Sequence, residues 1–352
     1  MFFIPVLFHF LGKQGITQVD WYILMGITIT ISVLLEIPAG MFADRFGTKL
    51  TLISSTALSV ITMFIFPLFH TFWGMVIPHF CLGISMACDS GTLEAYVHDN
   101  VGNDDYKKSF GRLQLFSLVG VVAVISSGFI VDKWSYSTPF YWTGWFHLVA
   151  FLLALLLPSN IPRETPRVKH FKQDVKIIRN FHPLLFLIGI GMFTAYVMQD
   201  FLKLESVNLD IWLFGPIIAS LQLFYILGKN LAHKVKSSYF VVLLIVLLST
   251  LAIAGLFPVW WAIPCFWSIA VTQGLLNIIT DDKLMSLTKN KASIVSIKSI
   301  GNRVYFAVIL LVFGLSVGII SMPSSLVVLT VVSVVWIMVH RARFVKMMIK
   351  NK

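Results

Sequence analysis

The sequence predicts an all-α membrane protein with twelve transmembrane helices in two six-helix bundles, the first helix being truncated. Three observations lead to this fold class. The 352 residues are 57% hydrophobic and only 12% charged, with a mean hydropathy of +0.86, whereas soluble domains carry about 25% charged residues. Apolar segments follow one another along the whole chain, and each helix that crosses the hydrocarbon needs about 20 apolar residues. One long polar stretch divides these segments into two equal sets.

The apolar segments define the expected helices. They run roughly over residues 1–12, 18–41, 50–69, 72–98, 109–131, 137–158, 183–203, 208–228, 237–257, 258–280, 292–318 and 322–342. The longest polar stretch between them, 159–182, contains six basic residues. We therefore predict an N-terminal bundle over 1–158, a cytoplasmic basic linker over 159–182, and a C-terminal bundle with a cytoplasmic tail over 183–352.

The first segment is shorter than the others. As a helix, residues 1–11 rise only about 16 Å, roughly half the hydrocarbon thickness. A chain that begins too late explains this, and a short tilted helix shielded by its neighbours is the alternative.

Lysine and arginine set the expected orientation. Of the 27 basic residues, 23 fall in the tail or in loops on one side of the predicted membrane, three fall on the other side (Lys13, Lys133 and Lys203), and Arg303 lies within a helix. Short loops rich in Lys and Arg stay in the cytoplasm. We expect a multi-pass protein of the plasma or inner membrane with both termini cytoplasmic. The net charge of +11 follows from this topology and does not indicate nucleic-acid binding.

The sequence offers no motif for enzyme chemistry. Its three cysteines lie in apolar segments, no CxxC or Cys/His spacing suits a metal, and no Gly-Lys-Ser/Thr loop could hold ATP phosphates. We expect no catalytic residues, no metal and no cofactor.

The loop between the second and third segments carries the most specific motif. Gly40, Asp44, Arg45, Gly47 and Lys49 match the pattern Gly-x-x-x-Asp-(Arg/Lys)-x-Gly-(Arg/Lys)-(Arg/Lys). This loop, residues 40–49, resembles the signature loop between helices 2 and 3 of the major facilitator superfamily of secondary transporters. The pattern ends in two basic positions, and a threonine occupies the first of them here. The resemblance implies alternating access to a small-molecule substrate, a coupling ion (most often a proton), a lipid bilayer as solvent, and a monomer.

Three further stretches, 90–99, 106–112 and 299–303, resemble a bacterial efflux-like subgroup of the same superfamily. This similarity implies proton-coupled export of a small organic molecule. Two features of the sequence depart from this resemblance. Residues 228–234 are a degenerate repeat of the signature that lacks its Asp. The fifth segment lacks the Gly-Pro step that many proton-driven drug exporters of the superfamily carry there, which weakens an assignment as a drug antiporter. Uptake of a sugar or similar metabolite is the runner-up, and a non-transporting scaffold or sensor with an incomplete first helix is the rival from another class.

Charged residues near the predicted cytoplasmic ends suggest an inner gate. In the family the Asp that matches Asp44 docks near the N-terminus of helix 11, where the helix dipole favours an anion; a solvated loop carboxylate is the alternative. Glu94 and Asp99 near the end of the fourth segment, and Arg112 at the start of the fifth, are the other predicted gate charges, with topological anchoring as their alternative.

Ionisable residues inside apolar helices are costly and therefore functional candidates. Asp89 is expected to be buried in the fourth helix, where a carboxyl group could carry a proton or bind a cationic group, or be satisfied by nearby hydroxyls. Arg303 is expected near mid-membrane in an ion pair or an anion site. The cavity candidates of the second half are Gln199, Asp200, Gln273 and Asn277, which could bind a polar substrate or join helices.

Overall fold

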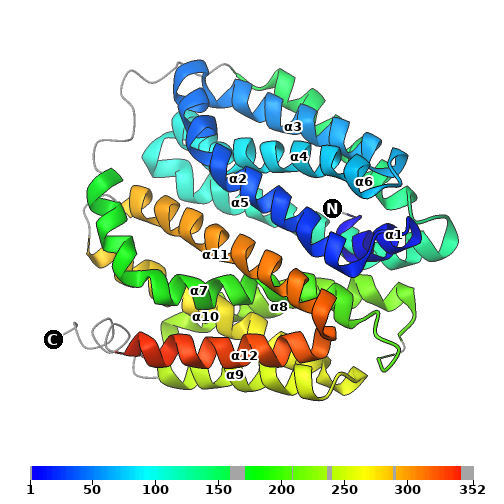
Figure 1. Cartoon of the computed structure of the whole chain (residues 1–352). Helices are drawn as coiled ribbons and strands as arrows, with labels where there is room; N and C mark the ends of the chain where they lie inside the picture. Colours follow the sequence, from blue (N-terminus) through cyan, green and yellow to red (C-terminus); the bar gives the residue numbers. More distant parts are fainter. Residues whose placement is uncertain (1, 159–170, 208, 236–239, 288–290, 342–352) are drawn as a thin grey trace. The chain divides into compact units, whose positions relative to one another are not determined.

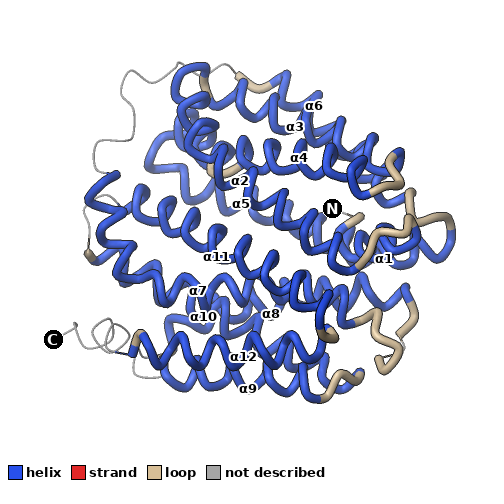
Figure 2. Tube along the Cα trace, viewed as in Figure 1, coloured by secondary structure: helices blue, strands red, loops and turns tan. Residues whose placement is uncertain are grey.

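The computed structural model consists mainly of helices joined by short loops, and it describes residues 2–158, 171–207, 209–235, 240–287 and 291–341 (Figure 2). Within these ranges the side chains of 94, 98–99, 101–118, 171–175, 233, 240–241, 291–293 and 295–296 are not described. No strand occurs in this part of the chain. The all-α prediction is therefore confirmed.

The helices run in the order shown in Figure 1. The α-helices are α1 (Leu7–Lys13), α2 (Gln18–Phe46), α3 (Thr48–Ile65), α4 (Phe72–Asp89), α5 (Thr92–Lys133), α6 (Thr138–Leu156), α7 (Phe171–Phe201), α8 (Phe214–Leu231), α9 (Phe240–Leu256), α10 (Ile263–Ser286), α11 (Lys291–Ile319) and α12 (Met322–Val339). Short 3₁₀ turns are η1 (Ile4–Val6), η2 (Phe66–Leu68), η4 (Ile211–Leu213), η5 (Ala232–Lys234) and η7 (Trp260–Ala262).

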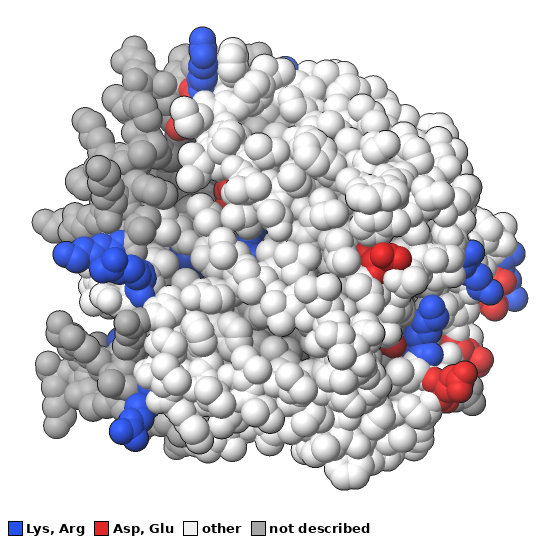
Figure 3. All heavy atoms as spheres, in the orientation of Figure 1, with Lys and Arg blue, Asp and Glu red and all other residues white. Residues whose placement is uncertain are grey.

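Nine helices of the described part are long and apolar enough to cross a membrane, and Ile4–Lys13 and Val242–Leu256 are shorter apolar helices. The short first helix was expected, and the count of twelve spans stays a prediction. Figure 3 shows that uncharged residues cover most of the visible face. This surface suits hydrocarbon rather than water.

The chain divides into two compact units. The first contains Met1–Pro166 and Ile211–Pro216, and the second contains Arg167–Asp210 and Ile217–Lys352. In the first unit α2 packs on α4, and α3 packs on α4 and α6. In the second, α7 packs on α10 and α11, and α9 packs on α10 and α12. The bounds predicted for the bundles and linker stay predictions.

Each unit has an aromatic core. Trp21, Phe66 and Phe140 are fully buried in the first unit, where the last two rings stack with centroids 5.0 Å apart. In the second unit Phe201 and Phe266 are fully buried, with centroids also 5.0 Å apart. Aromatic rings in such pairs add to the dispersion energy that holds membrane helices together.

The predicted end of the fourth helix was wrong. We expected it to continue to residue 98, but α4 ends at Asp89, and α5 is one helix from Thr92 to Lys133. The break lies at Gly91, whose φ of +69° is left-handed. Glycine adopts this conformation without the Cβ clash that other residues meet, so it ends a helix that apolar patterning alone would continue.

Gly47 of the signature loop has a conformational requirement. It separates α2 from α3 with φ +93° and ψ 150°, a region almost restricted to glycine. We expect Gly47→Ala to lower the free energy of unfolding by about 1–3 kcal/mol. Gly40→Ala is the matched control, because a Cβ there meets no atom within 4 Å. Equal melting temperatures for the two variants would contradict this account.

Candidate functional site

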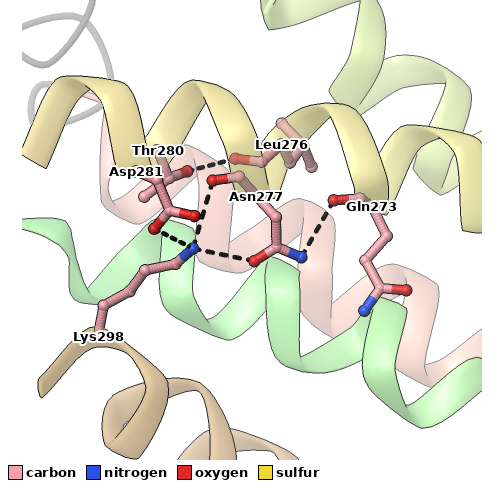
Figure 4. Close-up of polar contacts among 6 residues, drawn as sticks. All are labelled: Gln273, Leu276, Asn277, Thr280, Asp281 and Lys298. Atoms are coloured by element: carbon pink, nitrogen blue, oxygen red, sulfur yellow. Dashed lines mark hydrogen bonds and ion pairs between the residues drawn. The ribbon is translucent and has the colours of Figure 1, made fainter. Parts of the chain in front are cut away.

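A buried ion pair joins α10 to α11 in the second unit (Figure 4). The Lys298 Nζ atom donates to the Asp281 Oδ1 atom at 2.7 Å. It also donates to the side-chain oxygen of Asn277 at 3.0 Å and to the backbone oxygen of Asn277 at 3.3 Å. The Lys298 side chain is 5% exposed and that of Asp281 is 24% exposed. The ammonium group is therefore shut in among three oxygen acceptors.

Helix α10 supplies these acceptors from one face. Gln273, Asn277 and Asp281 are four residues apart, so an α-helix places them one above the other. The Asn277 amide donates to the Gln273 carbonyl oxygen at 3.2 Å. Figure 4 shows the three side chains along α10, with Lys298 of α11 reaching Asn277 and Asp281. We call these four residues the polar ladder.

Gln273, at one end of the polar ladder, contacts α7. With its amide group oriented to satisfy both neighbours, Gln273 donates to the Gly191 carbonyl oxygen at 3.0 Å and accepts from the Met192 N–H at 3.1 Å. Gly191 makes this contact possible because a Cβ there would overlap the Gln273 side chain. Three helices of the second unit are thus connected through one row of polar groups.

A buried ion pair such as Lys298–Asp281 is not explained by its contribution to stability alone. A buried ion pair often stabilises no more than apolar residues of the same volume, because both charges lose their hydration. Ionisable groups within membrane helices commonly mark ion or substrate pathways. If Asp281 took up a proton, Lys298 would lose its only ion-pair partner recorded among the described residues. The contacts of Lys298 therefore depend on the charge of its partner.

Only part of this site is predictable from the sequence. Gln273 and Asn277 were predicted cavity residues, and the structure brings them together. Lys298 was counted as a loop lysine, which was wrong: it lies within α11 and is 4% exposed. Asp281 was not considered at all. Two features of the sequence could have indicated the pair: Lys298 lies beside an apolar run, and Asp281 follows Asn277 by four residues, which places both on one helix face.

Other candidates of the second half lie away from the polar ladder. Gln199 and Asp200 are buried on α7, and Gln199 lacks a hydrogen bond at its Oε1 atom within the described structure. Gln199 is eight residues beyond Gly191 on α7, a rise of about 12 Å. Arg303 is half-buried on α11, five residues beyond Lys298. A rise of about 7.5 Å separates them.

In the first unit, Asp89 does not meet its prediction. We expected a carboxyl group buried within the fourth helix, but Asp89 is the last residue of α4 and its side chain is exposed. The desolvation that would favour a protonated carboxyl is thus absent. A carboxylate outside the predicted site residues lies nearby: Glu36 of α2 is half-buried and accepts a hydrogen bond from Ser90 Oγ at 3.0 Å.

The predicted inner-gate residues are only partly described. Asp44 is half-buried in the last turn of α2, and Arg45 is exposed above the Phe46 ring, 5.2 Å from its centroid. Lys49 is half-buried in the first turn of α3. The side chains of Glu94, Asp99 and Arg112 lie outside the described residues. Their backbone belongs to α5 rather than to two separate helices.

Known proteins resemble this chain in sequence and in structure. An uncharacterized transporter named YxaM of Bacillus subtilis (strain 168) is 27% identical over 187 residues, 49% of this chain and 46% of that protein. The quinolone resistance protein NorA of Staphylococcus aureus is 25% identical over 170 residues, 46% of this chain and 42% of that protein. The matches thus span about half the length of these curated relatives.

Solved structures share the fold. The nucleoside transporter NupG superposes with a TM-score of 0.74 at 15% identity, covering 100% of this chain and 97% of that one. A bacterial homologue of the human lysosomal transporter Spinster, in an inward-facing and occupied conformation, gives a TM-score of 0.66 at 16% identity, covering 98% and 93%. At these identities the likeness shows the fold alone.

The family model of the Major Facilitator Superfamily matches residues 1–297. This match covers most of the chain and includes the signature loop on which the resemblance rested. The chain is a multi-pass membrane protein that belongs to the major facilitator superfamily of transporters.

Proposed function

We propose that this chain is a proton-coupled secondary transporter that exports a small organic molecule by alternating access. The observation that carries the proposal is the buried Lys298–Asp281 ion pair of the polar ladder. A proton bound by Asp281 would neutralise the carboxylate and release the Lys298 ammonium from its partner. The energy of such a change in a water-poor site is several kcal/mol, enough to bias an equilibrium between two conformations.

The proton-motive force can drive transport that is coupled to this protonation. One elementary charge that moves across 100 mV supplies about 2.3 kcal/mol. We propose that protonation of Asp281 from the outside and deprotonation to the cytoplasm alternate with substrate binding. The signature-loop residues Asp44, Arg45 and Lys49 would serve the inner gate, together with Glu94, Asp99 and Arg112. We place the chain in the inner membrane as a monomer with cytoplasmic termini.

Export is supported by the similarity to NorA, whose name concerns quinolone resistance. Uptake of a sugar or similar metabolite is the second candidate, because the amides of Gln273 and Asn277 could bind a polar substrate in exchange for their present partners in the protein. The likeness of fold to a nucleoside transporter makes nucleosides the first such molecules to test. The two candidates differ in substrate class and in direction relative to the proton gradient.

A ligand screen distinguishes the candidates. Purified protein is heated with quinolones, lipophilic cations, nucleosides, sugars and amino acids, and its unfolding is followed. A ligand at 100 times its dissociation constant adds about 2.7 kcal/mol of stability. A quinolone or lipophilic cation that raises the melting temperature supports export, and a nucleoside or sugar supports uptake.

The hit is then assayed in proteoliposomes with an imposed pH gradient. Movement opposite to the proton flow supports export, and movement with it supports uptake. Silence across the panel from a folded protein, followed by no flux, would contradict both and favour the scaffold alternative.

A further inference from the structure

Two histidines face one another in the second unit. His182 lies on α7, and His340 is the C-cap residue that directly follows α12. Their Nε2 atoms are 3.2 Å apart, and the ring planes are inclined at 86° with centroids separated by 4.8 Å. Both side chains are half-buried. This pair plays no part in the polar ladder or the signature loop.

The His182 ring is oriented by the proline that follows it. Pro183 lies inside α7 and has no N–H, so the carbonyl oxygen four residues earlier, that of Arg179, lacks its usual helical donor. The His182 Nδ1 atom lies 2.8 Å from this Arg179 oxygen. A carbonyl oxygen can only accept, so Nδ1 must carry the proton.

The His340 ring is oriented in the same way. Its Nδ1 atom lies 2.9 Å from the Trp336 carbonyl oxygen, which also accepts from the His340 backbone N–H at 3.1 Å. The Trp336 ring packs on His340 with centroids 4.4 Å apart, and its Nε1–H donates to the Pro183 carbonyl oxygen at 3.3 Å. Trp336 thus joins the end of α12 to the proline of α7.

The hydrogen bonds fix the tautomer of both rings. Because each Nδ1 donates, the Nε2 of each neutral imidazole carries a lone pair. Two lone pairs 3.2 Å apart repel one another unless a proton or a metal ion lies between them. A metal ion meets this need: Zn–N bonds of about 2.0–2.1 Å in tetrahedral geometry hold two nitrogens about 3.3–3.4 Å apart.

We propose that His182 and His340 form a two-histidine site for a borderline divalent metal ion such as Zn²⁺ or Ni²⁺. The Nδ1–H to carbonyl contacts of both rings are the outer-shell hydrogen bonds that commonly orient metal-binding histidines. No group of three or more His, Cys, Asp or Glu ligands occurs among the described residues; we propose a site with two protein ligands, in which water completes the coordination. A bound ion would tie the α7 proline to the end of α12.

The test is a titration of the full-length, detergent-solubilised protein, freed of any histidine tag and treated with a chelator. Zinc chloride is added in a calorimeter, and we expect one ion per chain. His182→Ala and His340→Ala should each weaken binding at least about tenfold. His70→Ala is the control, because His70 lies in the first unit against Gln14, and it should bind like the wild type. Equal affinity in all four proteins would overturn the proposal.

A spectrum of the wild-type protein guards against variants that fail to fold. Cu²⁺ added in place of Zn²⁺ should show an electron paramagnetic resonance signal with coupling to two equivalent nitrogens. A signal without nitrogen coupling would overturn the proposal even if the alanine variants lost binding. This result would leave a proton shared by the rings as the occupant of the gap.

Pro183→Ala tests how the site is oriented. Alanine restores an N–H that competes with His182 for the Arg179 oxygen, while both metal ligands remain. We expect zinc affinity to fall about 10-fold, the lower end of outer-shell effects. Unchanged affinity would contradict the role of the proline in orienting His182.

Discussion

Asp281→Asn is expected to destabilise the second unit by about 3–5 kcal/mol, because it leaves the buried ammonium of Lys298 without its carboxylate. The Asn277 oxygens that remain are neutral acceptors and compensate the charge only in part. The loss is measured by thermal or denaturant unfolding of the purified protein in one detergent at fixed pH.

The reciprocal variant should be milder. Lys298→Met removes the ammonium and leaves Asp281, whose side chain is 24% exposed against 5% for Lys298. A carboxylate with this access to solvent can be hydrated, so its isolation costs less. We expect Lys298→Met to cost about half as much as Asp281→Asn. The opposite order would contradict the burial described for the pair.

The double variant Asp281→Asn with Lys298→Met separates stability from charge. Removing both charges of a buried pair is often neutral or stabilising, so we expect this protein to melt close to the wild type. Asp282→Asn is the matched control, since Asp282 is the next residue on α10 and is exposed. Its substitution should change stability by less than about 0.5 kcal/mol. A double variant as unstable as Asp281→Asn would mean that the pair does not act as a unit.

Gly274→Leu is expected to have a large packing effect, with a loss of more than about 3 kcal/mol or failure to fold. Gly274 of α10 faces Gly228 of α8, and an added Cβ would overlap the Tyr225 carbonyl oxygen and lie 2.9 Å from the Lys229 nitrogen. These are backbone atoms, which cannot rotate away as side chains do. Small residues at such crossings let membrane helices approach closely.

The position next to Gln273 makes this variant informative about the polar ladder as well. Forcing α10 away from α8 would move Gln273 relative to Gly191. Gly40→Leu is the control, because Gly40 lies on α2 with no atom within 4 Å of an added Cβ. Comparable expression and melting temperature for both variants would contradict the close α8–α10 packing.

Hydrophobic length predicted most of the fold. The segments expected over 137–158 and 322–342 appear as Thr138–Leu156 and Met322–Val339. An apolar run that crosses lipid forms a helix because its backbone N–H and C=O groups must hydrogen-bond within the segment. The break at Gly91 was missed. A glycine can continue a helix or end it, and only the backbone angle of the folded chain distinguishes the two.

The candidate site was predictable only along one helix. Gln273 and Asn277 share a face by their spacing, which sequence shows directly. The Lys298–Asp281 pair joins residues on different helices, and such a pairing depends on how α10 and α11 pack. Counting Lys298 among the loop lysines concealed it, because positive charge near a helix end is also the usual sign of topology.

The most direct test of the central proposal is substrate flux into proteoliposomes under an imposed pH gradient, with the substrate found in the ligand screen. The Asp281→Asn, Lys298→Met double variant is compared with the wild type and with Asp282→Asn. We predict that the wild type and Asp282→Asn respond to the gradient, whereas the folded double variant shows no gradient-driven flux. Wild-type flux with wild-type pH dependence in the double variant would contradict the role of the ion pair in coupling.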